Sequence, residues 1–412
     1  MLLYLKSRFD TEVEHYNFLP KKARNLLVSY FLQSAANPIL GTFMNAYIWS
    51  IDGGFTGIVN FSLGSFLGLP ITFFINGLLL KKFYVGFLYA AGSFTLGLSV
   101  ALVILLTRAG VVNFLIFGFI FGVGYGFYWA NRNYLTLTET KSKNRNYFTG
   151  INLALETVTS VLVPLCIGWF IYFGKILGID TYVVNSAVSL MFLLWAGLLV
   201  AKNNYPSPMI RKILAFRVST KWNWVRVYTF GIGITDGAAN FLVSLLILSN
   251  SWHEGILGTV DSFSAIILGV LFYFYGRKAK VHHQKTTYLF SLIVGILASI
   301  FLLIFPTTIF GVTMFASLYY FSIAFIWLTT DPMIMDFNDG EIKKNHIERY
   351  SLVFDREVFL NMGRIVPAIA FILIVNFVNP LQILKFTPIT TYLIHILIVI
   401  FLWRKLNFRS KL

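Results

Sequence analysis

Charged residues are scarce in this sequence. Only 12% of the 412 residues are Asp, Glu, Lys or Arg, whereas 57% are hydrophobic. A typical soluble domain carries about 25% charged residues, so this chain has too few to cover a surface exposed to water. The composition therefore favours an integral membrane protein over a soluble globular one.

Cysteine is nearly absent as well. Cys166 is the only one, so no disulfide can form within the chain. The sequence also lacks the His-Glu-x-x-His, Gly-x-Ser-x-Gly and Gly-x-x-x-x-Gly-Lys-Ser/Thr motifs, and His282-His283 have no partners at a metal-ligand spacing. A membrane enzyme would need a nucleophile, a base or a metal set, and an ATP-driven pump would need the phosphate-binding loop. We therefore expect no enzyme, no metal site and no cofactor.

Long apolar runs, in contrast, recur along the whole chain. Each has about 20 residues, enough to cross a hydrocarbon core of about 30 Å. We expect an all-α protein with twelve transmembrane helices, which fall near 27–49, 55–80, 84–107, 110–131, 148–174, 181–201, 224–249, 255–275, 286–305, 308–330, 353–378 and 387–404.

The formal net charge of +16 comes from basic residues that gather in alternate loops. The loops on the other side hold only Arg108, Lys175 and Lys385. Cytoplasmic loops are enriched in Lys and Arg, so this asymmetry predicts that both termini lie in the cytoplasm. It also accounts for the positive charge without a nucleic-acid partner.

The chain contains an internal repeat. A shift of 203 residues superimposes Tyr350 on Tyr147 and Pro367 on Pro164, and it carries 238–240 onto 35–37, both of which read Ala-Ala-Asn. One offset that holds at both ends of two half-chains predicts two similar halves. We expect a cytoplasmic tail at 1–26, a six-helix bundle at 27–201, a cytoplasmic linker at 202–223, a second six-helix bundle at 224–404 and a cytoplasmic tail at 405–412.

Six spans, a basic linker and six further spans form the hydropathy pattern of the major facilitator superfamily, which the chain resembles over nearly its whole length. Between the second and third spans, Gly77-Leu-Leu-Leu-Lys81-Lys82 keeps the glycine, the spacing and the basic residue of the family's signature, but Lys81 replaces its aspartate. The resemblance implies two six-helix pseudo-repeats around a central substrate cavity, which opens to each side of the membrane in turn.

Four charged residues lie in the interior of the expected spans, away from their ends: Glu156, Asp236, Asp261 and Arg364. A charged side chain costs free energy in the bilayer, so each needs a structural partner or a functional role. A desolvated carboxylate disfavours its ionised form, so Asp236, Glu156 and Asp261 are candidates for binding a proton or the substrate. Arg364 stays charged and needs a counter-charge, which could be Glu357, a carboxylate on another span, or the substrate. We expect it to face the central cavity.

Two further groups of polar residues belong to the predicted site. The first lies in the first and seventh spans, at about the same depth in the membrane as Asp236, and comprises Gln33, Asn37 and Asn240. The second lies near the inner membrane surface, where it could form a cytoplasmic gate or a structural set of ion pairs, and comprises Lys81, Lys82, Asp355, Arg356 and Glu357.

These features together predict a secondary active transporter that moves a small organic solute by alternating access and is coupled to protons. Export is slightly favoured over uptake of a sugar, a peptide or an organic anion. A lipid flippase and a non-transporting receptor on the same fold are the alternatives. The expected partners are the lipid bilayer, the solute and protons, and we expect a monomer in the cell membrane.

Overall fold

The computed structural model describes Tyr16 and residues 19–406, with gaps at 141, 209, 251, 279–283 and 346. Within these residues the regular structure is helical, with no strand. Most of the expected N-terminal tail, and residues 407–412 of the expected C-terminal tail, lie outside the described residues.

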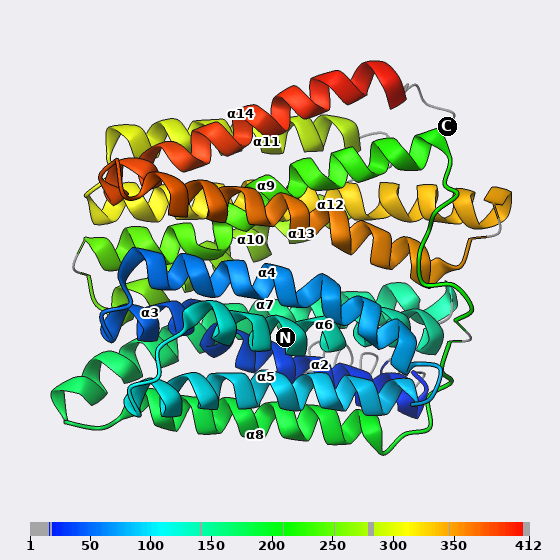
Figure 1. The fold of residues 1–412 in the computed structure, drawn as a ribbon, viewed down its shortest axis with the longest axis horizontal. Coiled ribbons are helices and arrows are strands. Elements are labelled where there is room, and N and C mark those ends of the chain that lie inside the picture. Colours follow the sequence, from blue (N-terminus) through cyan, green and yellow to red (C-terminus); the bar gives the residue numbers. More distant parts are fainter. Residues whose placement is uncertain are drawn as a thin grey trace, which may run out of the picture.

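The helices form two sets that are joined by residues 202–219. The first half contains α2 (Lys21–Leu40), α3 (Thr42–Ser50), α4 (Gly54–Leu79), α5 (Val85–Arg108), α6 (Phe114–Glu139), α7 (Ser142–Ile176) and α8 (Thr181–Ala201). The second half contains α9 (Thr220–Ser249), α10 (Glu254–Lys278), α11 (Gln284–Ile304), α12 (Ile309–Asn345), α13 (Arg349–Ile374) and α14 (Pro380–Leu406). In Figure 1 the helices run along the long axis of the molecule, and the connecting segment lies at the end where the C-terminus lies, which we call the linker end.

Eleven of the described helices, α4 to α14, are long and apolar enough to cross a membrane. Many large apolar side chains, such as Leu105, Met191 and Leu397, lie exposed on the outside of the helices, as lipid contact requires. The chain is therefore an all-helical, multi-pass membrane protein. The first expected span, 27–49, falls on the two shorter helices α2 and α3, which the sequence did not distinguish.

The same helix contacts occur in both halves. In the first half α5 packs on α6 and α8, α2 packs on α7 and α8, and α4 packs on α6. In the second half α11 packs on α12 and α14, α9 packs on α13 and α14, and α10 packs on α12. The main contacts between the halves are α7 with α10 and α4 with α13.

Glycines set the closest helix contacts. A Cβ atom on Gly118 of α6 would lie 1.9 Å from the carbonyl oxygen of Phe61 on α4, and one on Gly122 would lie 2.3 Å from that of Ser65. Only glycine fits at such distances, and small residues drive helix association in membranes for this reason. The sequence places Gly118, Gly122, Gly124 and Gly126 in the fourth expected span, a composition that predicts close helix packing, and the structure confirms it for α6.

Two helices extend well beyond their expected ends. The fourth span was expected to end at 131 and the tenth at 330, with charged loops following them. Helix α6 instead continues to Glu139 and α12 to Asn345. Arg132 and Asp331 are therefore helical residues, and the prediction that Arg132 begins a loop is wrong. A helix can leave the hydrocarbon core without ending, because its backbone hydrogen bonds are satisfied internally in either solvent.

Side chains connect the halves at both ends of the molecule. At the linker end, the Tyr350 hydroxyl donates to the Phe73 carbonyl oxygen at 2.7 Å and accepts from Asn76 Nδ2 at 3.1 Å. At the opposite end, Asn45 Nδ2 donates to the Asn240 carbonyl oxygen at 3.0 Å, and Trp169 Nε1 donates to Thr259 Oγ1 at 3.1 Å. A cavity lies between these contacts.

Candidate functional site

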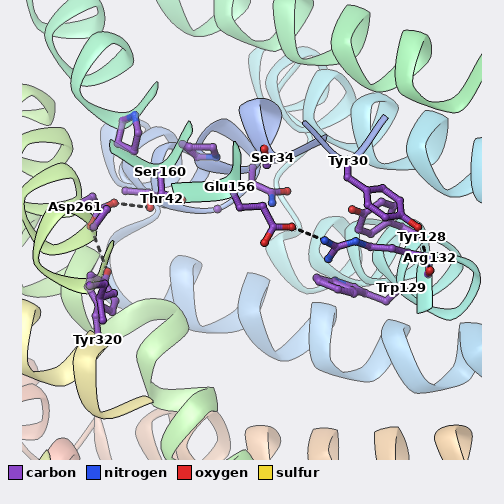
Figure 2. A pocket seen from close by; sticks show the side chains of 16 residues that line it. Tyr30, Ser34, Thr42, Tyr128, Trp129, Arg132, Glu156, Ser160, Asp261 and Tyr320 are labelled. Carbon is purple, nitrogen blue, oxygen red and sulfur yellow. Dashed lines mark hydrogen bonds and ion pairs between the residues drawn. The ribbon is translucent and has the colours of Figure 1, made fainter. Parts of the chain in front are cut away.

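The cavity has a volume of about 420 Å³ and is lined by residues of both halves. This is within the usual range of about 300–1,000 Å³ for small-molecule sites. Helices α2, α3, α6 and α7 contribute from the first half and α10 and α12 from the second. Its walls combine aromatic, hydroxyl and charged side chains and consist of Tyr30, Ser34, Asn37, Pro38, Gly41, Thr42, Tyr128, Trp129, Arg132, Glu156, Ser160, Pro164, Asp261, Ala265, Leu268 and Tyr320 (Figure 2).

The break between α2 and α3 forms part of the wall. Pro38 lacks a backbone N–H, and Gly41 leaves the helical conformation with φ −105° and ψ −88°. The Gly41 N–H still donates to the Asn37 carbonyl oxygen at 3.0 Å, so the chain bends without fully separating. The break exposes the Asn37 and Thr42 side chains to the cavity. Discontinuous helices of this kind border the binding sites of many transporters.

An ion pair between Arg132 of α6 and Glu156 of α7 lies on one side of the cavity. The Arg132 Cζ atom is 4.6 Å from the Trp129 ring centre and 4.7 Å from that of Tyr30, which is the geometry of cation–π contacts. Asn152 Nδ2 donates a further hydrogen bond to Glu156 Oε1 at 3.1 Å. From the sequence, Arg364 was a possible counter-charge for Glu156, and Arg132 was not considered because it was placed in a loop. The structure pairs Glu156 with Arg132 instead.

Asp261 of α10 has a different environment. Its Oδ2 accepts from the Thr42 hydroxyl at 2.9 Å and its Oδ1 accepts from the Tyr320 hydroxyl at 3.3 Å. Thr42 belongs to α3 of the first half, so this hydrogen bond crosses between the halves. Among the described residues Asp261 forms no ion pair. Figure 2 shows it on the side of the view opposite Arg132, with Glu156 between them.

Asp236 and Arg364 pair with each other inside the second half. Arg364 Nε lies 2.7 Å from Asp236 Oδ2, and Trp327 Nε1 donates to Asp236 Oδ1 at 3.0 Å. A Cβ on Gly237 would lie 2.5 Å from the Arg364 Cα, so the glycine after Asp236 lets α9 and α13 approach closely enough for the pair. Of the counter-charges considered for Arg364, the structure selects Asp236.

This second cluster is separate from the cavity lining described above. Neither Asp236 nor Arg364 is among the residues that line the cavity. The Arg364 guanidinium lies 5.9 Å from the ring centre of Phe66 on α4, so the pair faces the first half across the interface. Their side chains are 14% and 18% exposed, which means that the charges depend on each other rather than on water.

The three amides predicted for the site are dispersed. Asn37 lines the cavity and its Oδ1 accepts from the Tyr125 hydroxyl at 3.4 Å. Asn240 Nδ2 donates to the Asp236 carbonyl oxygen at 2.9 Å, one turn back on α9. Gln33 is fully buried in α2, and neither its Nε2 nor its Oε1 has a hydrogen-bond partner among the described residues.

The residues considered for a cytoplasmic gate lie at the linker end. Asp355 accepts from Arg226 Nε at 2.8 Å and from Trp222 Nε1 at 2.7 Å, both on α9. The Glu357 backbone carbonyl oxygen accepts from Asn361 Nδ2 at 2.8 Å, but its carboxylate forms no hydrogen bond or ion pair with the residues that the structure describes. Lys81 and Lys82 are exposed.

Arg356, the remaining gate candidate, forms an ion pair with Asp331 of α12. The ion pairs of Asp355 and Arg356 therefore lie within the second half. Sequence reasoning did not identify Asp331, because the tenth span was expected to end one residue before it.

Comparisons with known proteins agree with this architecture. No family model matches the sequence. The Bacillus subtilis (strain 168) protein named Uncharacterized protein YqgE is 27% identical over 355 residues, which cover 84% of this chain and 80% of that protein.

Two solved structures show a similar arrangement of helices. One comes from a study of substrate recognition in proton dependent oligopeptide transporters. Its TM-score is 0.65 at 12% identity, and the match covers 94% of this chain and 97% of the other. The other is FucP, a Major Facilitator Superfamily transporter in the outward conformation, with a TM-score of 0.55 at 14% identity and coverage of 94% and 99%. Both are transporters and not enzymes. The chain therefore has the fold of a major facilitator superfamily transporter.

Proposed function

We propose that the chain is a secondary active transporter that moves a small organic solute across the cell membrane by alternating access. The main support for the proposal is the cavity, which lies between the two halves and is lined by charged groups from both. A cavity between two helix bundles is accessible from either side when the bundles rock against each other. The transporters that share the fold support the same reading.

The proposal includes the organisation expected from the sequence. The two rocking bodies are residues 27–201 and 224–404, joined by the cytoplasmic linker 202–223, with both termini in the cytoplasm. The matching helix contacts of the two halves support this division. The protein acts as a monomer, since the cavity uses residues of one chain.

Proton coupling is assigned to Asp261. Asp236 and Glu156 each have an arginine partner, so an ion pair must be broken before either can take up a proton. Asp261 has only the neutral donors Thr42 and Tyr320. Its protonation changes a hydrogen bond between the halves, and this is how a proton can bias one conformation over the other. Because a proton that enters can be exchanged for a solute that leaves, export remains favoured over uptake.

The test is proton flux in liposomes that contain the purified protein and an internal pH-sensitive dye. With a pH gradient imposed, at least one compound of a broad solute library should change the internal pH. Asp261→Asn should abolish the pH change. Asp180→Asn, which alters a carboxylate at the opposite end from the linker, serves as the matched control.

Other outcomes separate the alternatives. Solute movement without a pH change would support uncoupled uptake, and movement of labelled lipid alone would support a flippase. Ligand binding with no flux of any kind would identify a receptor and contradict the proposal.

A further inference from the structure

The charges that line the cavity do not balance. Its lining includes one cation, Arg132, and two carboxylates, Glu156 and Asp261. Arg132 and Glu156 neutralise each other in their ion pair. Asp261 therefore leaves one negative charge on the wall formed by α10, without a protein cation to compensate it among the lining residues.

The partners of Asp261 orient its carboxylate without neutralising it. Thr42 and Tyr320 each donate one hydrogen bond, to different oxygens. A carboxylate has about four lone-pair positions, so both oxygens retain the capacity to accept from a ligand. A desolvated charge that lacks a counter-ion attracts an ion of the opposite sign into the cavity.

Four aromatic residues also line the cavity. Tyr320 lies beside Asp261, whereas Tyr30, Tyr128 and Trp129 lie around Arg132 on the opposite side (Figure 2). The face of an aromatic ring attracts a cation, and it also provides apolar contact for an organic group. The cavity already shows this chemistry, since the Arg132 guanidinium lies over the rings of Trp129 and Tyr30.

From these observations we propose that the solute is a small organic cation with one positive charge and an apolar or aromatic body, held by the Asp261 carboxylate and the surrounding rings. The inference rests on the proposed transport function and names its substrate class. A cavity of about 420 Å³ limits the solute to a small molecule. An organic anion would meet the unpaired Asp261, and its natural partner, Arg132, is already occupied by Glu156.

A proton and the cation then require the same carboxylate. Besides the Thr42 and Tyr320 hydroxyls, the groups that face the cavity with Asp261 include the ion pair of Arg132 and Glu156. Acidification that protonates Asp261 removes the charge that holds the cation, so cation binding weakens as the pH falls.

Thermal unfolding of the purified full-length protein tests the inference with three probes of similar shape. These are benzyltrimethylammonium as the cation, benzyl alcohol as the neutral compound and benzylsulfonate as the anion, each at millimolar concentration. A ligand that binds the folded state raises the midpoint of unfolding. We expect the cation alone to raise it, and we expect its Kd to increase by about tenfold for each pH unit once Asp261 is protonated.

Substitutions locate the binding. Asp261→Asn should weaken cation binding at least tenfold, about 1.4 kcal/mol. Asp261→Glu should retain the preference for the cation because it keeps the charge. Asp180→Asn should bind as the wild type does. The pH dependence uses the unaltered protein, so it decides the matter even if Asp261→Asn fails to fold.

The inference is overturned if benzyl alcohol or benzylsulfonate stabilises the protein as much as the cation does, if the cation gives no shift, or if Asp261→Asn binds it normally. These results would leave proton flux in liposomes untouched, so the transport proposal would stand with another substrate class. Cation binding without proton flux would instead support the cation site and contradict the transport proposal.

Discussion

Each half of the molecule contains an ion pair between corresponding helices, and the two pairs have opposite polarity. In the first half Arg132 on α6 pairs with Glu156 on α7. In the second half the carboxylate is on α12, as Asp331, and the arginine is on α13, as Arg356.

The surroundings of the two pairs also correspond. The Arg132 Cζ atom lies 4.6 Å from the ring centre of Trp129, and the Arg356 Cζ atom lies 5.4 Å from that of Trp327. A tryptophan, an ion pair and two neighbouring helices thus recur with the charges exchanged. Helix geometry alone does not require the acidic and basic residues to exchange places. We therefore expect the exchange to act where the two halves face each other.

Burial distinguishes the pairs. The side chains of Arg132 and Glu156 are 12% and 32% exposed, and those of Arg356 and Asp331 are somewhat more exposed, at 19% and 42%. The first pair also borders the cavity. We therefore expect the first pair to contribute more to both stability and transport, and three substitutions test this comparison.

The largest effect is expected for Arg132→Ala. It leaves Glu156 without its counter-charge and removes the cation from two aromatic faces. The free energy of unfolding should fall by about 2 kcal/mol, below the value for a fully buried pair because water reaches Glu156. Flux in liposomes should be lost. Denaturant unfolding in detergent measures the first effect, and the double variant Arg132→Met with Glu156→Gln controls for unpaired charge.

The next effect concerns transport alone. Exchanging the second pair, by Asp331→Arg with Arg356→Asp, gives both halves the same polarity. The pair itself remains, so the free energy of unfolding should change by less than about 1 kcal/mol. Both residues lie toward the linker end, where alternating access requires the halves to rearrange, so the reversed polarity should lower flux at least about tenfold.

A matched exchange on the same two helices provides the control for that experiment. Arg349 and Asp339 pair across α13 and α12, but their side chains are 53% and 58% exposed. Exchanging them should leave flux unchanged. Equal flux in all three proteins would show that the polarity of the Asp331–Arg356 pair has no role in closure.

The smallest effect is expected for Arg356→Ala. Water can solvate Asp331 once its partner is removed, so the free energy of unfolding should fall by no more than about 1 kcal/mol. A loss as large as that of Arg132→Ala would remove the distinction between the pairs. The same unfolding assay measures both.

Much of the architecture follows from the sequence. Apolar runs of sufficient length predict the spans, and eleven of the twelve appear as single long helices. Gly118 and Gly122 predicted close packing, which their contacts with α4 confirm. The free energy needed to place an arginine inside the membrane predicted a counter-charge for Arg364. This prediction follows from the residue type and its position in the span.

The partners themselves could not be predicted in the same way. Arg132 and Asp331 were not recognised as helical residues, because a charged residue at the edge of an apolar run was taken as the end of the helix. A helix continues past such a residue as long as its backbone hydrogen bonds continue. The pairing of Asp261 with Thr42 depends on how α3 meets α10, a contact between residues 219 positions apart. Periodicity within one helix carries no information about it.

Helix α3 has a consequence for the mechanics of the protein. By its position in the sequence, α3 belongs to the first half, and the Tyr47 and Thr107 hydroxyls connect it to α5 by a hydrogen bond of 2.7 Å. Yet Thr42 binds Asp261, and Asn45 binds Asn240, both across the interface. Residues 42–50 are therefore hydrogen-bonded to both halves, and Gly41 lies at the bend where they leave α2.

Separation of the halves at this end must release at least the hydrogen bonds of Thr42 and Asn45. At roughly 0.5–1.5 kcal/mol each, the two hydrogen bonds add to the free energy needed to separate the halves at this end. Under the proposed alternating access, the nine-residue helix α3 therefore contributes to the barrier between conformations, although it is much shorter than the helices on either side of it.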